Sequence, residues 1–291
     1  MIDSHVHLYP PDVNRDPAGW AAAHREPHWS ALCLRRRRDG RPVQAFPDTG
    51  GLLRAMDAAG VGRAVLLGWY WETPASCLAQ NRFYAACVRS HPDRLAAAAT
   101  LHPSAGREAA LAELRRARDD GLRGIGELSP HAQGYAVDDP VFRSILAEAG
   151  IRGLPVTLHA TDPDSRPYPG RVLTPLEDFL RLAREFPATT FILAHWGGLL
   201  PLRIPEAATL RNIYYDTSAS PLNYDDGIWR RFLGSVPAGR VVFGSDFPLN
   251  LYPRQDDAPS MIRLIAEVRG AGLSAGALEA VLQENARRLF F

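Results

Sequence analysis

Residues 4–11 read SHVHLYPP, and this stretch decides between two α/β folds. It closes the first apolar segment, Ile2–Leu8, where an open doubly wound sheet normally carries a glycine-rich turn. His5 and His7 lie two residues apart, so on a strand their side chains project to the same face. Both imidazoles can therefore point into the mouth of a closed barrel and share one metal ion.

Seven further short apolar segments follow, separated by longer segments of helical pattern. Several are continuous apolar runs without polar alternation, which is typical of parallel strands covered on both faces. One intervening helix has a clear start, because Thr174-Pro175-Leu176-Glu177 reads as a capping box with proline at the first helical position. The seven segments are Arg63–Trp69, Leu95–Leu101, Leu122–Leu128, Pro155–His159, Thr190–His195, Asn212–Asp216 and Arg240–Gly244.

Eight strands that are each followed by a helix predict a (β/α)8 TIM barrel, one α/β domain over residues 1–291. The connection after the first strand, residues 9–49, is unusually long and rich in Pro, Trp, His and Arg. Connections of that length are usually functional or disordered. Because it leaves the C-terminal end of a strand, where barrels build their sites, we interpret it as a lid or substrate loop.

Composition excludes several classes of function. The 33 basic residues against 32 acidic ones leave a net charge of +1, so no nucleic-acid or membrane partner is expected. All basic residues are arginine, which excludes Schiff-base, P-loop and carbamylated-lysine chemistry. No apolar run suits a membrane span, the N-terminus is not a signal peptide, and three scattered cysteines form no disulfide framework. A cytoplasmic protein is expected.

Further metal-binding side chains stand at the ends of other expected strands. His159 closes the fifth segment, His195 closes the sixth, and Asp246 follows the eighth. The C-terminal strand ends of a barrel converge on a common site, so these three can join His5 and His7. Nitrogen and oxygen ligands with an open position suit a catalytic Zn²⁺ or a similar cation. The alternative for each residue alone is a strand cap or a loop hydrogen bond.

Taken together, several motifs resemble the amidohydrolase superfamily, in particular its amidohydrolase 2 branch, which includes decarboxylases and lactonases. The motifs are DSHVH (3–7), LH (158–159), AHWGG (194–198), GSDFP (244–248) and NARRLF (285–290). The resemblance implies that His5, His7, His159 and Asp246 hold the principal metal. It also implies that His195 binds a second metal or polarises the substrate. Asp246 would serve as the general base for metal-bound water.

Glu127 decides how many metals are expected. It lies in the fourth segment, facing the same mouth, and it is the strand's sole candidate for a bridging ligand because the chain has no lysine. The alternative is a buried glutamate paired with an arginine such as Arg123. We therefore expect one divalent metal, most simply Zn²⁺, with a second left open, and no organic cofactor.

Several residues are candidates for contact with a small-molecule substrate. Trp69 and Trp71 end the second strand, Trp196 follows His195, and His102 follows the third strand. Arg36 lies in the run Arg35–Arg38, which either binds a carboxylate or phosphate or forms a solvated turn. The sequence contains no GxSxG elbow and no Cys–His pairing, so it does not indicate an enzyme with a serine or cysteine nucleophile.

These observations predict a metal-dependent hydrolase that cleaves a small ester, lactone or amide, with a carboxylated substrate as one option. Asp246 and His195 would carry the chemistry. The first alternative is a non-oxidative decarboxylase of a small aromatic or muconate-type acid, which would use the same residues. The second is a binuclear phosphodiesterase or nuclease similar to the TatD proteins, which Glu127 alone favours. Assembly into a homo-oligomer stays open.

Overall fold

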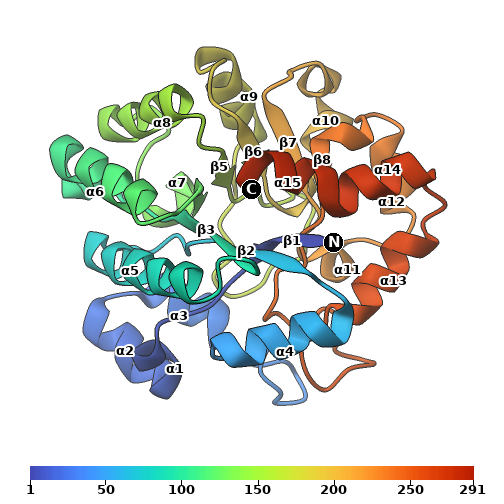
Figure 1. The fold of residues 1–291 in the computed structure, drawn as a ribbon, viewed down its shortest axis with the longest axis horizontal. Coiled ribbons are helices and arrows are strands. Elements are labelled where there is room, and N and C mark those ends of the chain that lie inside the picture. The colour runs from blue at the N-terminus through green and yellow to red at the C-terminus, as the bar shows by residue number, and fades with distance from the viewer.

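The computed structural model describes all residues, 1–291, and its centre is a barrel of eight parallel strands in chain order. Figure 1 looks along this barrel, with the helices arranged around it. The predicted (β/α)8 TIM barrel is confirmed. The strands are β1 (Ile2–Val6), β2 (Arg63–Leu66), β3 (Leu95–Ala99), β4 (Gly124–Leu128), β5 (Val156–Leu158), β6 (Phe191–Leu193), β7 (Ile213–Asp216) and β8 (Val241–Val242).

Backbone hydrogen bonds close the barrel between its first and last strands. The amide of Ser4 donates to the carbonyl of Phe243 at 2.8 Å, and that of Asp246 donates to the carbonyl of His5 at 2.9 Å. The amide of His7 donates to the carbonyl of Phe247 at 2.7 Å. The segment after β8 is thereby fixed against β1, with Asp246 beside the two histidines.

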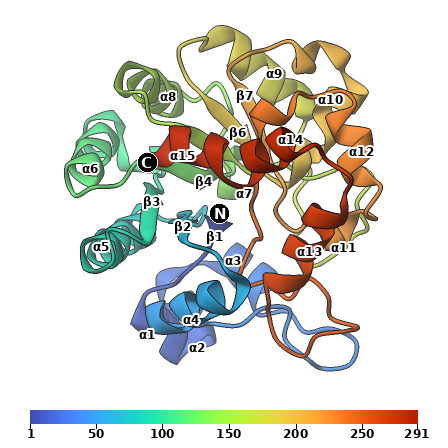
Figure 2. The same cartoon turned by 45° about the vertical axis from the view of Figure 1, so that its right-hand side comes forward.

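Amphipathic helices surround the strands and bury their apolar faces against the sheet (Figures 1 and 2). No helix combines the length and the apolar character needed to cross a membrane. The helices are α1 (Pro11–Arg15), α2 (Pro17–His24), α3 (Pro27–Cys33), α4 (Thr49–Ala59), α5 (Pro74–Ser90), α6 (Arg107–Asp119), α7 (Pro130–Gln133), α8 (Pro140–Arg152), α9 (Leu176–Glu185), α10 (Leu200–Arg203), α11 (Ser220–Asn223), α12 (Ile228–Leu233), α13 (Ile262–Gly270), α14 (Ala275–Glu279) and α15 (Asn285–Phe290).

The C-terminal helix α15 covers the end of the barrel at which the strands begin (Figure 1). Ala286 and Phe290 of this helix pack with Ile2, Ala98 and other inward-facing barrel residues in one buried cluster. The ring of Phe290 lies against Gly124, where a Cβ would stand 3.0 Å from it. This end of the barrel is therefore filled with apolar side chains, and the opposite end carries the polar ones.

The connection after β1 is not a simple loop. It contains the three short helices α1, α2 and α3, which pack against one another in sequence and lie on the same side of the barrel as α4 (Figures 1 and 2). Proline stands at the first position of each, where its missing amide hydrogen costs nothing. Trp20 and Trp29 from this segment are buried against Tyr9 and Trp71, so a separate aromatic cluster holds it to the barrel. Its role as a lid stays a prediction.

One detail of the sequence prediction is wrong. Thr174 does not cap α9. Its hydroxyl instead accepts a hydrogen bond from the amide of Thr161 at 2.9 Å, which ties the two ends of the β5–α9 connection together.

Candidate metal centre and active site

Six side chains expected at the site meet at the C-terminal end of the barrel. Three are buried: His5, His7 and Glu127. Three are half-buried and open toward solvent: His159, His195 and Asp246. His5 and Glu127 lie on β1 and β4, and the other four follow the ends of β1, β5, β6 and β8 by one to four residues, so the parallel strands bring all six together as the fold requires.

The two histidines of β1 present their Nε2 atoms to each other at 3.1 Å. Each ring is oriented by a partner at Nδ1. His5 Nδ1 lies 2.8 Å from Asp216 Oδ2, and His7 Nδ1 lies 3.1 Å from the carbonyl of Leu67. Because these partners are acceptors, each Nδ1 carries the hydrogen and each Nε2 keeps a lone pair. Two nitrogens this close need either a proton or a metal cation between them.

Carboxylate oxygens complete this group. Asp246 Oδ1 lies 3.5 Å from His7 Nε2 and 3.7 Å from His5 Nε2, and Glu127 Oε2 lies 3.7 Å from both. Metal–ligand bonds of about 2.0–2.2 Å separate two ligands of one ion by about 3–3.6 Å. The nitrogen and oxygen atoms of His5, His7 and Glu127 therefore form a group that could hold a divalent cation, and Asp246 lies beside its two histidines.

Glu127 also belongs to a second group of metal-capable atoms. Its Oε1 lies 2.9 Å from His159 Nδ1 and 3.4 Å from His195 Nε2, and these two nitrogens are 3.1 Å apart. No ion pair joins Glu127 to Arg123, so the arginine-paired alternative is not what the structure contains. Glu127 instead faces four histidines, two with each carboxylate oxygen.

The electrostatics of the centre favour positive charge at His5 but not at His7. Burial alone would lower the pKa of His5, yet the carboxylate of Asp216, followed by those of Glu127 and Asp246, raises it to about 10. Burial and the positive charge of His5 lower the pKa of His7 to about 3. Burial raises the pKa of Asp246 to about 6, so this acid holds a proton more readily than an exposed aspartate does.

Asp216 is a site residue that the sequence reasoning missed. It ends β7 and is fully buried, and besides His5 it accepts hydrogen bonds from the backbone amides of His195 (3.0 Å) and Ser218 (2.9 Å). Ser218 Oγ lies 2.9 Å from His195 Nδ1, so one carboxylate orients both histidines. Its position could have identified it, because Asp216 lies at the C-terminal end of a strand, as the other site residues do.

The turn that carries His195 is left-handed. His195, Trp196, Gly197, Gly198 and Leu199 all have φ between 57° and 62°. A Cβ on Gly197 would lie 2.7 Å from the ring of Tyr215, and one on Gly198 would lie 2.9 Å from Leu176. The two glycines are therefore required both by the backbone conformation and by the space beside it. This turn directs His195 toward Glu127.

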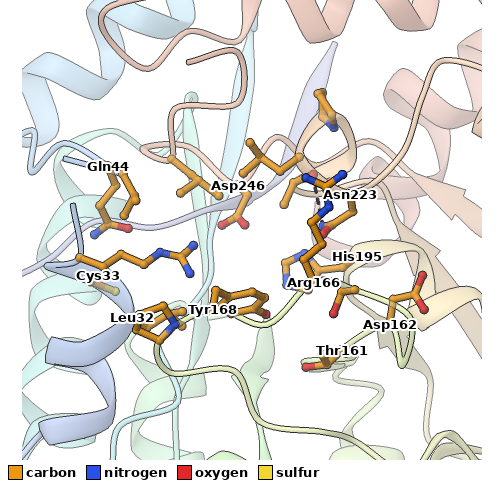
Figure 3. A pocket seen from close by; sticks show the side chains of 18 of the residues that line it. Leu32, Cys33, Gln44, Thr161, Asp162, Arg166, Tyr168, His195, Asn223 and Asp246 are labelled. Carbon is orange, nitrogen blue, oxygen red and sulfur yellow. Dashed lines mark hydrogen bonds between the residues drawn. The ribbon is translucent and has the colours of Figure 1, made fainter. Parts of the chain in front are cut away.

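A pocket of about 1010 Å³ opens above the metal-capable atoms. Figure 3 looks into it, with Asp246 and His195 among the labelled lining residues and with Arg166 and Tyr168 from the β5–α9 connection. Trp69 lines it as expected and packs on His7 with ring centroids 5.1 Å apart. Arg36 also lines it, but its side chain is exposed and donates to the carbonyl of Gly40 at 2.7 Å.

Three residues expected to contact substrate lie outside this pocket. Trp71 is buried with the insertion helices, and its indole donates to Gln80 at 2.6 Å. His102 uses both ring nitrogens locally, with Gln133 and Ser104. The left-handed turn directs Trp196 away from the pocket and into the core, where it packs against Trp229 and Phe232. These three side chains support the architecture around the site.

Comparison with known families accounts for nearly the whole chain. The model of the amidohydrolase family, in its second branch, matches residues 2–291. This chain belongs to the amidohydrolase family. The resemblance carried by the DSHVH, AHWGG and GSDFP motifs is confirmed, and with it an enzyme of this superfamily.

Two curated relatives of this amidohydrolase are decarboxylases by name. The 6-methylsalicylic acid decarboxylase of Aspergillus aculeatus is 30% identical over 219 residues, which are 62% of this chain and 64% of that protein. The 6-methylsalicylic acid decarboxylase of Penicillium expansum is 26% identical over 297 residues, which are 85% of this chain and 84% of that protein. The chain thus spans less than two thirds of the first relative and most of the second.

A solved structure has the same fold. The 5-carboxyvanillate decarboxylase of Novosphingobium aromaticivorans, complexed with manganese and 4-hydroxy-3-methoxy-5-nitrobenzoic acid, matches with a TM-score of 0.74 over 99% of this chain and 95% of that chain. At 16% identity this likeness shows the barrel architecture. Family and cluster together support a divalent metal in this amidohydrolase, and the manganese of that neighbour leaves zinc unconfirmed.

The expected reaction needs correction. Hydrolysis of an ester, lactone or amide is contradicted by the decarboxylase names of both curated relatives, which favour the alternative of non-oxidative decarboxylation. The error has a physical source. A metal ion beside a protonatable aspartate serves either reaction, so the residues His5, His7 and Asp246 did not distinguish them.

Proposed function

We propose that this amidohydrolase is a metal-dependent, non-oxidative decarboxylase of small aromatic acids of the hydroxybenzoate type. Both curated relatives are named for such a substrate, 6-methylsalicylic acid. The pocket supports the proposal, since it combines a metal-capable cluster, the aromatic walls of Trp69 and Tyr70, and the half-buried acid Asp246.

The residues divide between metal binding and proton transfer. His5, His7, Glu127 and Asp246 would hold the divalent cation, and His159 and His195 flank it through Glu127. The bound cation supplies Lewis-acid polarisation of substrate oxygens. Asp216 keeps His5 in the tautomer whose Nε2 is free, and Trp69 forms an apolar wall beside His7.

Asp246 is assigned the proton-transfer step. When the bond between the ring carbon and the carboxylate breaks, CO₂ leaves and the electron pair stays on the ring carbon. A proton must reach that carbon, and the new C–H bond takes the electron pair. Asp246 lies at the pocket floor with Oδ1 beside His5 and His7, where the reacting carbon of a bound acid would lie, and this position carries the proposal. Water then returns the proton to Asp246.

The proposal is tested with purified protein and a panel of aromatic acids. The protein is stripped with a chelator, reloaded with Mn²⁺ or Zn²⁺, and incubated with 6-methylsalicylate, salicylate and 2,6-dihydroxybenzoate. Release of CO₂ and of the matching phenol by the reloaded protein, with none from the stripped protein, is the expected result. Turnover that persists at full rate after complete metal removal would contradict the proposed role of the cation.

A further inference from the structure

Six arginines line the pocket, and none of them forms an ion pair. They are Arg35, Arg36, Arg37, Arg38, Arg166 and Arg254. Away from the pocket, arginines such as Arg116, Arg203 and Arg263 are paired with carboxylates. The pocket is also lined by five acids, but Asp162 and Asp164 are bound by Arg203, and neither these two nor Glu127, Asp225 or Asp246 forms an ion pair with any of the six arginines.

Arg35 and Arg37 are both half-buried, and the Nε of each is fully buried without a hydrogen-bond acceptor. Arg35 differs in that the rest of its guanidinium makes no hydrogen bond within the protein either. Arg36 and Arg37 each donate a guanidinium hydrogen to a backbone carbonyl, that of Gly40 or Asn250. Burial of a charged donor without an acceptor is costly, so the position of Arg35 calls for an oxygen ligand.

The guanidinium of Arg35 is held in place by an aromatic ring. It lies over Tyr168, 4.7 Å from the ring centroid, in a cation–π contact. Tyr168 belongs to the β5–α9 connection and Arg35 to the insertion after β1, and these segments are fastened to each other. His28 Nε2 donates to the carbonyl of Gly170 at 2.9 Å, and a Cβ on Gly170 would stand 3.0 Å from Leu32.

We infer that Arg35 binds a second acidic group of the substrate, so that the preferred substrates are aromatic diacids. This inference rests on the proposed function, because it concerns the substrate of the same pocket. One carboxylate is the group that is lost beside the metal-capable cluster. The other is bound by Arg35 in the pocket wall, and the positive charge of Arg166 adds to its attraction for this carboxylate. A guanidinium suits a carboxylate because it forms two parallel hydrogen bonds with it.

The test is equilibrium binding, which needs no turnover. Calorimetry on metal-loaded protein compares salicylate with 4-hydroxyisophthalate and 2-hydroxyterephthalate, which add a second carboxylate at different ring positions. At least one diacid is expected to bind about tenfold or more tightly than salicylate. Arg35→Gln is expected to remove this advantage, because a charge-assisted hydrogen bond accounts for roughly a tenfold difference in affinity. The affinity of the variant for salicylate is expected to change less than about threefold.

Two further variants test whether the effect comes from the Arg35 guanidinium itself. Arg54→Gln removes one positive charge from an exposed position on α4, outside the pocket, and is expected to keep the diacid preference. Arg35→Lys keeps the charge without the planar fork, so a partial preference is expected. Thermal unfolding verifies that each variant is folded, and if Arg35→Gln is not folded, Arg35→Lys decides.

The outcomes separate this inference from the proposed function. Equal losses of salicylate and diacid affinity in Arg35→Gln would overturn it, because Arg35 would then bind the carboxylate common to both. Absence of any diacid preference in the unmodified protein would overturn it as well. If the preference holds and no acid releases CO₂, the anion site stands and the decarboxylase proposal fails.

Discussion

Asp216 Oδ2 lies 2.8 Å from His5 Nδ1, which fixes the tautomer of the histidine at the centre of the metal-capable cluster. The carboxylate is fully buried, and its other oxygen accepts hydrogen bonds from the backbone of His195 and Ser218. One residue at the end of β7 therefore organises ligands from β1 and β6. Partners of this kind commonly change metal affinity by one to two orders of magnitude.

Asp216→Asn is expected to weaken metal binding by about 10- to 100-fold, since an amide lacks the negative charge that holds the His5 Nδ1 hydrogen. Metal retained after dialysis against a graded series of chelator concentrations measures the effect. A variant with unchanged metal retention would show that the Asp216 contact is not used by the centre.

Glu127→Gln tests how many ions the centre holds. Glu127 Oε1 already lies at hydrogen-bonding distance from His159 Nδ1, at 2.9 Å, which leaves Oε2 for one cation beside His5 and His7. The unmodified protein is therefore expected to bind about one ion per chain, and the variant to bind it more weakly. Plasma mass spectrometry of both proteins gives the count. Two ions that fall to one in the variant would identify Glu127 as a bridge instead.

Asp246→Asn is expected to lower turnover by about 10²- to 10⁴-fold, the usual contribution of a positioned acid or base. The amide oxygen still faces His5 and His7, so binding of a substrate analogue is expected to change far less. Steady-state rates and calorimetry with a non-reactive nitrobenzoate measure the two quantities separately. Near-normal turnover would remove Asp246 from the proton-transfer step.

Gly197→Ala tests the left-handed turn that carries His195. The added Cβ would lie 2.7 Å from the Tyr215 ring at a φ of 59°, so a loss of about 1–3 kcal/mol in unfolding free energy is expected. Gly276→Ala is the matched control, because its Cβ meets nothing within 4 Å and the residue lies in a helix. That control is expected to be neutral or slightly stabilising. Equal stability of both variants would contradict the strain argument.

Much of the fold could be predicted because its strands are short, continuously apolar and buried on both faces. All eight were placed in order, but most were drawn too long. The second, expected over Arg63–Trp69, ends at Leu66, and the amide of Gly68 donates to the carbonyl of Gly126 in β4 instead of continuing the β2–β3 ladder. Such ends depend on tertiary contacts, as the use of Thr174 by Thr161 also illustrates.

The site was predictable where a residue's direction follows from its place on a strand, as for His5, His7 and Glu127. It was not predictable where a turn sets the direction. Trp196 follows a site histidine directly, yet the left-handed turn sends its side chain into the core. The importance of Arg35 over Arg36 likewise depends on Tyr168, more than 130 residues away in sequence, which no local pattern reveals.

The central claim is that a metal-bound aromatic acid loses CO₂ and gains a proton at the same carbon. Its most direct test is turnover of carboxyl-¹³C-labelled 6-methylsalicylate and a labelled diacid in D₂O, followed by mass spectrometry of gas and product. We expect ¹³CO₂ in equal amount to a phenol carrying one deuterium at the vacated ring position, and only when metal is present. If the same preparation leaves the labelled acids unchanged but hydrolyses an ester or lactone efficiently, decarboxylation is contradicted.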